Sequence, residues 1–206
     1  MTNTVFVKRY AEDFPVNRRE IWRYAGFKGQ PDKPLNELLG MVIADFEGKL
    51  NYRVCYRKFC DLPFGKDSKD LQKALRGSEE VVLFAATVGL EIDRYIAKYQ
   101  HISATRALLA QAYGAERIEA LCDAFCKEFA GRTRRFSPGY GDLPLEAQKE
   151  IFALLDCSKH IGVSLNDSLL MTPSKSVTAV FGIGGAMECC AEKCEFCSNS
   201  ECNYRR

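Results

Sequence analysis

Residues 80–87, with the sequence EVVLFAAT, are the feature that most constrains the fold. β-Branched and apolar side chains dominate this run, which is typical of a buried strand. Residues 176–183 form a second strong run of the same kind. Together the two runs predict a sheet with buried strands, which other elements must cover.

Much of the remaining chain has helical periodicity. Ser103 is suited to cap a long helix that runs to about residue 129, unless Gly114 breaks or kinks it. Glu91 and Asp93 suit the first turn of another helix. The sequence therefore predicts an α+β fold with few strands and with helices at the sides of the sheet. The predicted helices are residues 17–24, 35–50, 67–75, 90–99, 103–129 and 145–155, and the other predicted strands are 52–59 and 132–136.

Length and composition set further bounds. The 206 residues fit one domain, or one domain with an appendage, and a hydrophobic content of 47% can supply a core. A net charge of +2 gives no reason to expect nucleic acid or a membrane as a partner. The apolar runs are too short to span a bilayer, and the N-terminus shows no signal peptide. We therefore expect a cytoplasmic protein, whose ten cysteines are thiols or metal ligands rather than disulfides.

Five of the ten cysteines lie in the last eighteen residues. Cys190, Cys194, Cys197 and Cys202 are separated by three, two and four residues, so one loop could wrap a tetrahedral zinc or an iron–sulfur cluster. Cysteines that bind no metal are the alternative. The spacing favours a metal site, because short gaps and few apolar residues require something to organise this segment.

A second candidate site is the turn from Arg135 to Tyr140. Pro138 fixes the backbone, and Gly139 permits a positive φ or a close ligand approach. Such a turn can point a guanidinium, which suits a carboxylate, and an aromatic ring at one small molecule. S-Adenosylmethionine has a carboxylate, a base and a sulfonium that would use these groups. A plain turn is the alternative interpretation.

Three other groups of residues have structural interpretations. Cys122 and Cys126 lie one helical turn apart, and two ligands do not make a metal site, so we expect them in the core. Glu119 and Asp123 share a face of the same predicted helix. His160 is expected to be structural or exposed.

Several segments resemble the activation (reactivation) domain of cobalamin-dependent methionine synthase, in that family's order. Residues 135–140 match its Arg-x-x-x-Gly-Tyr motif, which binds S-adenosylmethionine, and residues 171–177 match its "MxPxxSV" segment. Residues 84–93 look like its strand-to-helix segment, and residues 159–168 look like its "KHIGMKLTES" segment. Residues 20–26 resemble the opening of free-standing versions of the domain.

The resemblance implies a single α+β domain with a mixed or antiparallel sheet and flanking helices. It also implies an accessory role in methionine biosynthesis, in which an oxidised corrinoid is remethylated from S-adenosylmethionine with one electron from a flavodoxin- or ferredoxin-like donor. Arg135 would clamp the ligand's carboxylate and Tyr140 would pack against the ligand, while Ser137 and Gly139 would shape the pocket. Glu119, or a neighbouring carboxylate, would approach the ligand's positive end.

The chain also departs from the family. It has no cobalamin-binding module and no Asp-x-His-x-x-Gly cobalt-ligand motif, so the corrinoid must come on a partner methyltransferase. We therefore predict an S-adenosylmethionine-binding domain at residues 1–183 and a cysteine-rich tail at 184–206. Because the implied reaction needs an electron, we favour an iron–sulfur cluster over zinc in the tail. The rival interpretations are an iron–sulfur electron-transfer module and a binding module stabilised by structural zinc.

Overall fold

A four-stranded antiparallel sheet is the centre of the computed structural model, which describes residues 4–11 and 14–184. The strand order is β1-β2-β3-β6, so β6 pairs with β3 although the two are far apart in the sequence. A separate two-stranded sheet joins β4 to β5. The strands are β1 (Phe6–Tyr10), β2 (Tyr52–Phe59), β3 (Glu80–Thr87), β4 (Ser164–Leu165), β5 (Met171–Thr172) and β6 (Ser176–Ile183).

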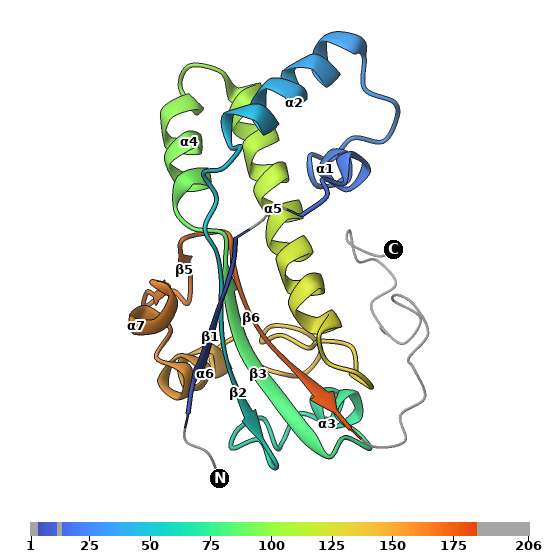
Figure 1. The fold of residues 1–206 in the computed structure, drawn as a ribbon, viewed down its shortest axis with the longest axis vertical. Helices are drawn as coiled ribbons and strands as arrows, with labels where there is room; N and C mark the ends of the chain where they lie inside the picture. Colours follow the sequence, from blue (N-terminus) through green and yellow to red (C-terminus); the bar gives the residue numbers. More distant parts are fainter. Residues whose placement is uncertain (1–3, 12–13, 185–206) are drawn as a thin grey trace.

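Helices cover both faces of the four-stranded sheet. The long helix α5 lies on one face together with α1, α2 and α4, and α6 and α7 pack against the other face (Figure 1). The predicted α+β class and the antiparallel sheet with flanking helices are therefore confirmed. The helices are α1 (Arg18–Tyr24), α2 (Lys33–Asp45), α3 (Lys69–Ala74), α4 (Glu91–Tyr99), α5 (Ala104–Lys127), α6 (Ala147–Leu155) and α7 (Cys157–Ile161).

Strand β3 is buried on both faces, which explains its continuous apolar sequence. Val82, Phe84 and Ala86 enter the core on the α5 side, where Phe84 contacts the ring of Phe125 with centroids 5.0 Å apart. The alternate residues of β3 enter a second core under α6 and α7. Because successive side chains of a strand point to opposite faces, a strand between two layers needs apolar residues at every position.

The predicted strand at residues 132–136 is wrong. Only Phe136 forms a β-bridge with β6, exchanging two hydrogen bonds of 2.8 Å with Val180, and the N–H of Thr133 donates to the carbonyl of Gly182 at 2.9 Å. Nearer the end of β6, the hydroxyl of Thr133 accepts the N–H of Gly182 at 2.9 Å. A side chain thus replaces a backbone acceptor there, and no regular strand ladder forms. The strand predictions at 52–59, 80–87 and 176–183 are confirmed.

Helix α5 continues through Gly114 without a break. Ser103 caps the helix as predicted, because its hydroxyl accepts the N–H of Arg106. The glycine is needed for packing: a Cβ at position 114 would lie 2.9 Å from atoms of both Ile92 and Lys175. Gly114 therefore brings α4 and the start of β6 close to the middle of α5, instead of ending the helix.

Candidate functional site

An open groove of about 1350 Å³ runs between α1 and α5. Its volume exceeds the range of about 300–1,000 Å³ that is usual for small-molecule pockets. The lining mixes aromatic rings with charged side chains of both signs. It comprises Phe14, Pro15, Asn17, Arg18, Arg19, Glu20, Trp22, Arg23, Tyr24, Phe27, Lys28, Gly29, Gln30, Pro31, Asn36, Glu116, Glu119, Ala120, Asp123, Ala124 and Lys127.

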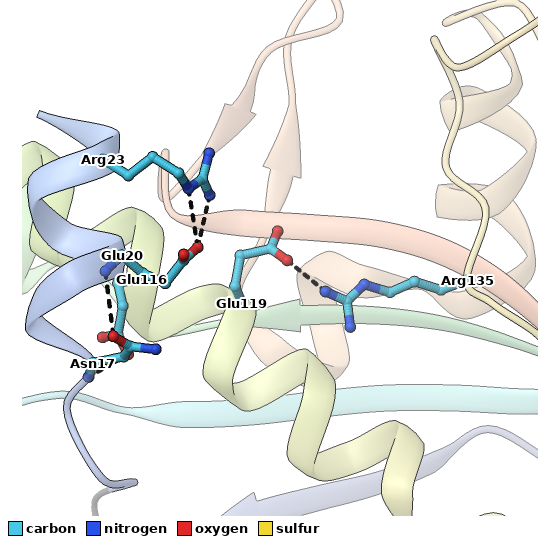
Figure 2. Close-up of polar contacts among 6 residues, drawn as sticks. All are labelled: Asn17, Glu20, Arg23, Glu116, Glu119 and Arg135. Atoms are coloured by element: carbon cyan, nitrogen blue, oxygen red, sulfur yellow. Dashed lines mark hydrogen bonds and ion pairs between the residues drawn. The ribbon is translucent and has the colours of Figure 1, made fainter. Parts of the chain in front are cut away.

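Neither Arg135 nor Tyr140 is among the residues that line this groove, but Arg135 contacts two carboxylates of α5 that are. Its guanidinium donates one hydrogen bond to Glu119 and another, of 2.5 Å, to Oδ1 of Asp123. Figure 2 shows Glu119 leaving α5 toward Arg135, while Glu20 and Arg23 of α1 pair with each other nearby. The Arg135 side chain is 22% exposed. The structure therefore brings together two of the residues that the sequence analysis selected, Arg135 and Glu119.

The charge of Arg135 is stabilised by its surroundings. Burial works to lower the pKa of Arg135, but the nearby carboxylates of Glu119 and Asp123 raise it above its usual value. The same face of α5 carries buried thiols. Burial raises the pKa of Cys122, and it raises the pKa of Cys126 to about 11 although Arg135 acts in the opposite direction. Both thiols are therefore protonated near neutral pH, and their burial agrees with the predicted core role.

The turn after Arg135 is tightly bonded. The N–H of Tyr140 donates to the carbonyl of Ser137 at 3.2 Å, and the N–H of Gly139 donates to the carbonyl of Leu143 at 2.9 Å. Gly139 has a φ of +87°, which fits the predicted need for glycine at this position. Tyr140 is 67% exposed. A large aromatic residue thus stands on the surface, five residues from an arginine at the groove.

A buried ion pair holds the α1 side of the groove. The guanidinium of Arg117 is fully buried, and it donates to both carboxylate oxygens of Glu116 at 2.6 and 2.7 Å. It also donates to the backbone carbonyls of Phe14 and Pro15, at 2.5 and 2.9 Å. Glu116 in turn accepts the N–H of Asn17, which caps α1. The entry into α1 is therefore fixed to α5 by charge-assisted hydrogen bonds.

The sequence analysis did not identify this ion pair or the α1 wall. Adjacent Glu116 and Arg117 in an otherwise apolar stretch of helix were the available signal, because charged residues are seldom buried unless they are paired. The proposed metal ligands Cys190, Cys194, Cys197 and Cys202 lie outside the described residues. Within residues 4–11 and 14–184, no group of three or more histidines, cysteines or acidic residues could hold a metal ion.

A membrane-crossing helix is also absent from the part of the chain that the structure describes, where no helix combines the necessary length and apolar character.

Comparison with known proteins supports one fold and finds a similarity to one family over part of the chain. The sequence pattern of the family described as "Vitamin B12 dependent methionine synthase, activation domain" matches residues 113–187, which include the second half of α5 and the Arg135–Tyr140 turn. No curated protein matches the chain. Among solved structures, the crystal structure of the MetH reactivation domain bound to AdoHcy matches with a TM-score of 0.63 and 15% sequence identity, over 91% of this chain and 81% of that one. Fold and sequence pattern together confirm that this chain resembles the activation domain of vitamin B12-dependent methionine synthase.

Proposed function

We propose that this chain binds S-adenosylmethionine in the groove between α1 and α5 and serves the reductive remethylation of a corrinoid on a separate methyltransferase. The observation that carries the proposal is the contact of Arg135 with Glu119 and Asp123 at the groove. One cation and two carboxylates meet there, and the exposed Tyr140 follows the cation by five residues in the sequence. The similar MetH reactivation domain is bound to AdoHcy, the demethylated form of the same ligand, which supports this assignment.

The charges at the groove fit the two ends of an amino-acid group. Arg135 uses two of its five N–H donors on Glu119 and Asp123, and others can reach a ligand carboxylate. The same two carboxylates can attract the ligand's ammonium and sulfonium charges. The ring of Tyr140 can stack on the adenine or lie against the sulfonium. The carboxylate, the ammonium, the sulfonium and the adenine ring of the ligand thus each have a candidate partner.

In the proposed reaction, the sulfonium methyl passes to cobalt. One electron from a low-potential carrier first converts Co(II) to Co(I), and the cobalt electron pair then forms the new carbon–cobalt bond while the carbon–sulfur bond breaks. The leaving group is the neutral thioether, S-adenosylhomocysteine. The chain's own residues hold the methyl in line with the acceptor, so their contribution is proximity and orientation. The mechanism requires neither a protein nucleophile nor a general base.

The nearby thiols would not compete for the methyl group. A cysteine attacks as its thiolate, and the pKa of Cys126 is about 11 while that of Cys122 is also raised by burial. Arg135 lowers the pKa of both thiols, but burial outweighs it. The site can therefore keep two cysteines beneath the ligand's anchoring residue without methylating them.

A reconstitution experiment tests the proposal. The chain is mixed with S-adenosylmethionine, a reductant and a Co(II)-state corrinoid methyltransferase that lacks its own activation domain, and methylcobalamin is followed by its absorption spectrum. We expect methylcobalamin to form with the wild type and to form much more slowly with Tyr140→Ala. If every corrinoid protein encoded by the same cell stays in the Co(II) state in this assay, the proposed reactivation function is refuted.

We further propose that Cys190, Cys194, Cys197 and Cys202 bind a metal, with an iron–sulfur cluster favoured over zinc. The support is their spacing, because four thiolates within thirteen positions can surround one metal centre. A cluster would give the chain an electron-transfer group of its own. If the protein carried the cluster but did not bind S-adenosylmethionine, an electron-transfer module would be the better account.

A further inference from the structure

We propose that Asp142 is a positioning residue for the candidate ligand site, which holds Tyr140 at a fixed place relative to Arg135. Asp142 lies outside the Arg-x-x-x-Gly-Tyr motif and has no proposed contact with the ligand. This inference rests on the proposed binding of S-adenosylmethionine, and it adds the residue that fixes the aromatic end of the turn.

The first half of the turn is fixed to the sheet. Phe136 follows Arg135 and exchanges two backbone hydrogen bonds of 2.8 Å with Val180 of β6. Its N–H and its carbonyl are both used in this pairing. The position of Arg135 is therefore set by the edge of the central sheet, together with its ion pairs to α5.

The second half of the turn is fixed to α3 by Asp142. One carboxylate oxygen accepts from the hydroxyl of Ser68 and from the N–H of Asp70 at 3.2 Å. The other oxygen accepts the N–H of Lys69 at 2.7 Å. Ser68 is the N-cap of α3 and is 4% exposed. Asp142 thus binds the exposed N–H groups of α3 across more than seventy residues of sequence.

Tyr140 lies between two glycines in the left-handed region. Gly139 has a φ of +87° and Gly141 a φ of +54°. A Cβ at Gly141 would lie 2.3 Å from Oδ2 and 3.0 Å from Cβ of Asp70, so the chain passes close to the Asp70 side chain of α3. The backbone on the C-terminal side of Tyr140 is thereby held by α3, and Asp142 is the side chain that makes the connection.

The hydrogen bonds to Asp142 also lower the pKa of its carboxyl group. The bond from Ser68 is the main cause that lowers the pKa of Asp142, and the N–H groups of Lys69 and Asp70 act in the same direction. A hydroxyl and two backbone N–H groups thus converge on one carboxylate, although the residue is on the surface. The carboxylate therefore connects the chain after Tyr140 to the start of α3.

The test is a double-mutant cycle on ligand affinity, measured by calorimetric titration of the full chain with S-adenosylmethionine. We expect Asp142→Ala to weaken binding about tenfold, and Asp142→Asn to weaken it less because the amide keeps one acceptor oxygen. In the Tyr140→Ala background, Asp142→Ala should have little further effect, because both variants disturb the same contact. If Asp142 only stabilised the fold, the losses of affinity caused by Asp142→Ala and Tyr140→Ala would multiply in the double variant.

A matched variant separates positioning from general loss of stability. Ser103→Ala removes the side-chain cap of α5, whose hydroxyl accepts the N–H of Arg106 far from the turn. It should leave the affinity unchanged. If Asp142→Ala binds as tightly as the wild type, or if its effect multiplies with that of Tyr140→Ala, the positioning role is refuted. If the wild type itself does not bind the ligand, the proposed function fails instead, so the two failures are distinct.

Discussion

Glu119 of α5 accepts a hydrogen bond from Arg135, which lies sixteen positions later in the loop after the helix. The pairing gives the carboxylate of α5 a second task besides any contact with a ligand: it orients the guanidinium. Asp123, one helical turn further on, completes the arrangement. The guanidinium of Arg135 is therefore held in place without a ligand. If Arg135 binds the ligand as proposed, this order reduces the loss of conformational entropy on binding.

Arg135→Ala should weaken S-adenosylmethionine binding by about 2–3 kcal/mol, because a charge-assisted pair with the ligand carboxylate is lost. Isothermal titration calorimetry measures this directly. Arg134→Ala is the matched control, since Arg134 is the exposed neighbour of the same type, and its affinity should stay near that of the wild type. If the Arg135→Ala variant binds the ligand as tightly as the wild type, Arg135 does not contact the ligand.

The thiol of Cys126 should resist alkylation at neutral and mildly alkaline pH. With a pKa of about 11, only about one molecule in a thousand carries the thiolate at pH 8. Labelling by iodoacetamide, followed by mass spectrometry, should therefore modify the exposed Cys60 long before Cys126. Rapid labelling of Cys126 in the folded chain at pH 8 would contradict the raised pKa.

The same thiol should make the protein less stable at high pH. An unfolded cysteine ionises near pH 8.5, whereas folded Cys126 holds its proton up to about 11. The folded state binds more protons in this interval, so the free energy of unfolding falls as the pH rises through it. Denaturation of Cys126→Ser and of the wild type across pH 8–11 checks this, and the wild type should show the steeper loss.

Local patterns made much of the fold predictable. Strands β2, β3 and β6 were predicted to the residue, because β3 and β6 are long apolar runs and β2 shows alternation. The predicted helix at 35–50 differs more: α2 begins earlier, where Asp32 caps it, and ends at Asp45. Strand β1 was not predicted, since the edge position leaves Phe6 and Val7 partly exposed and requires no continuous apolar run.

The candidate site was predictable only where it is local in sequence. The turn from Ser137 to Tyr140 follows from its own Pro and Gly residues. The pairing of Asn17 with Glu116 joins residues 99 positions apart, and that of Lys69 with Asp142 joins residues 73 apart. Such contacts depend on how the layers pack, and the sequence carries no pattern that pairs them. Glu119 was selected through the resemblance, whereas its bond to Arg135 appears only in the folded chain.

Protein purified anaerobically should contain iron and sulfide, bound by the cysteine-rich tail. Broad absorption near about 400 nm is expected of a thiolate-ligated cluster, and Cys194→Ala or Cys197→Ala should abolish it. Cys60→Ala is a suitable control, because Cys60 lies outside the tail. One zinc per chain, with no iron after anaerobic reconstitution, would favour structural zinc instead.

Arg117→Met should destabilise the protein by about 3–5 kcal/mol, because it leaves Glu116 as a buried charge without its partner. The double variant with Glu116→Gln should recover part of this loss, since the uncompensated charge is then gone. Urea unfolding curves give both values. Arg94→Met is the control: its ion pair with Glu91 is exposed, so its removal should cost less than about 1 kcal/mol. If Arg117→Met costs no more stability than Arg94→Met, the buried ion pair contributes no more to the free energy of unfolding than a surface pair does. This result would also mean that the anchoring of Phe14 and Pro15, and with them the α1 wall of the groove, depends on apolar packing rather than on this charge.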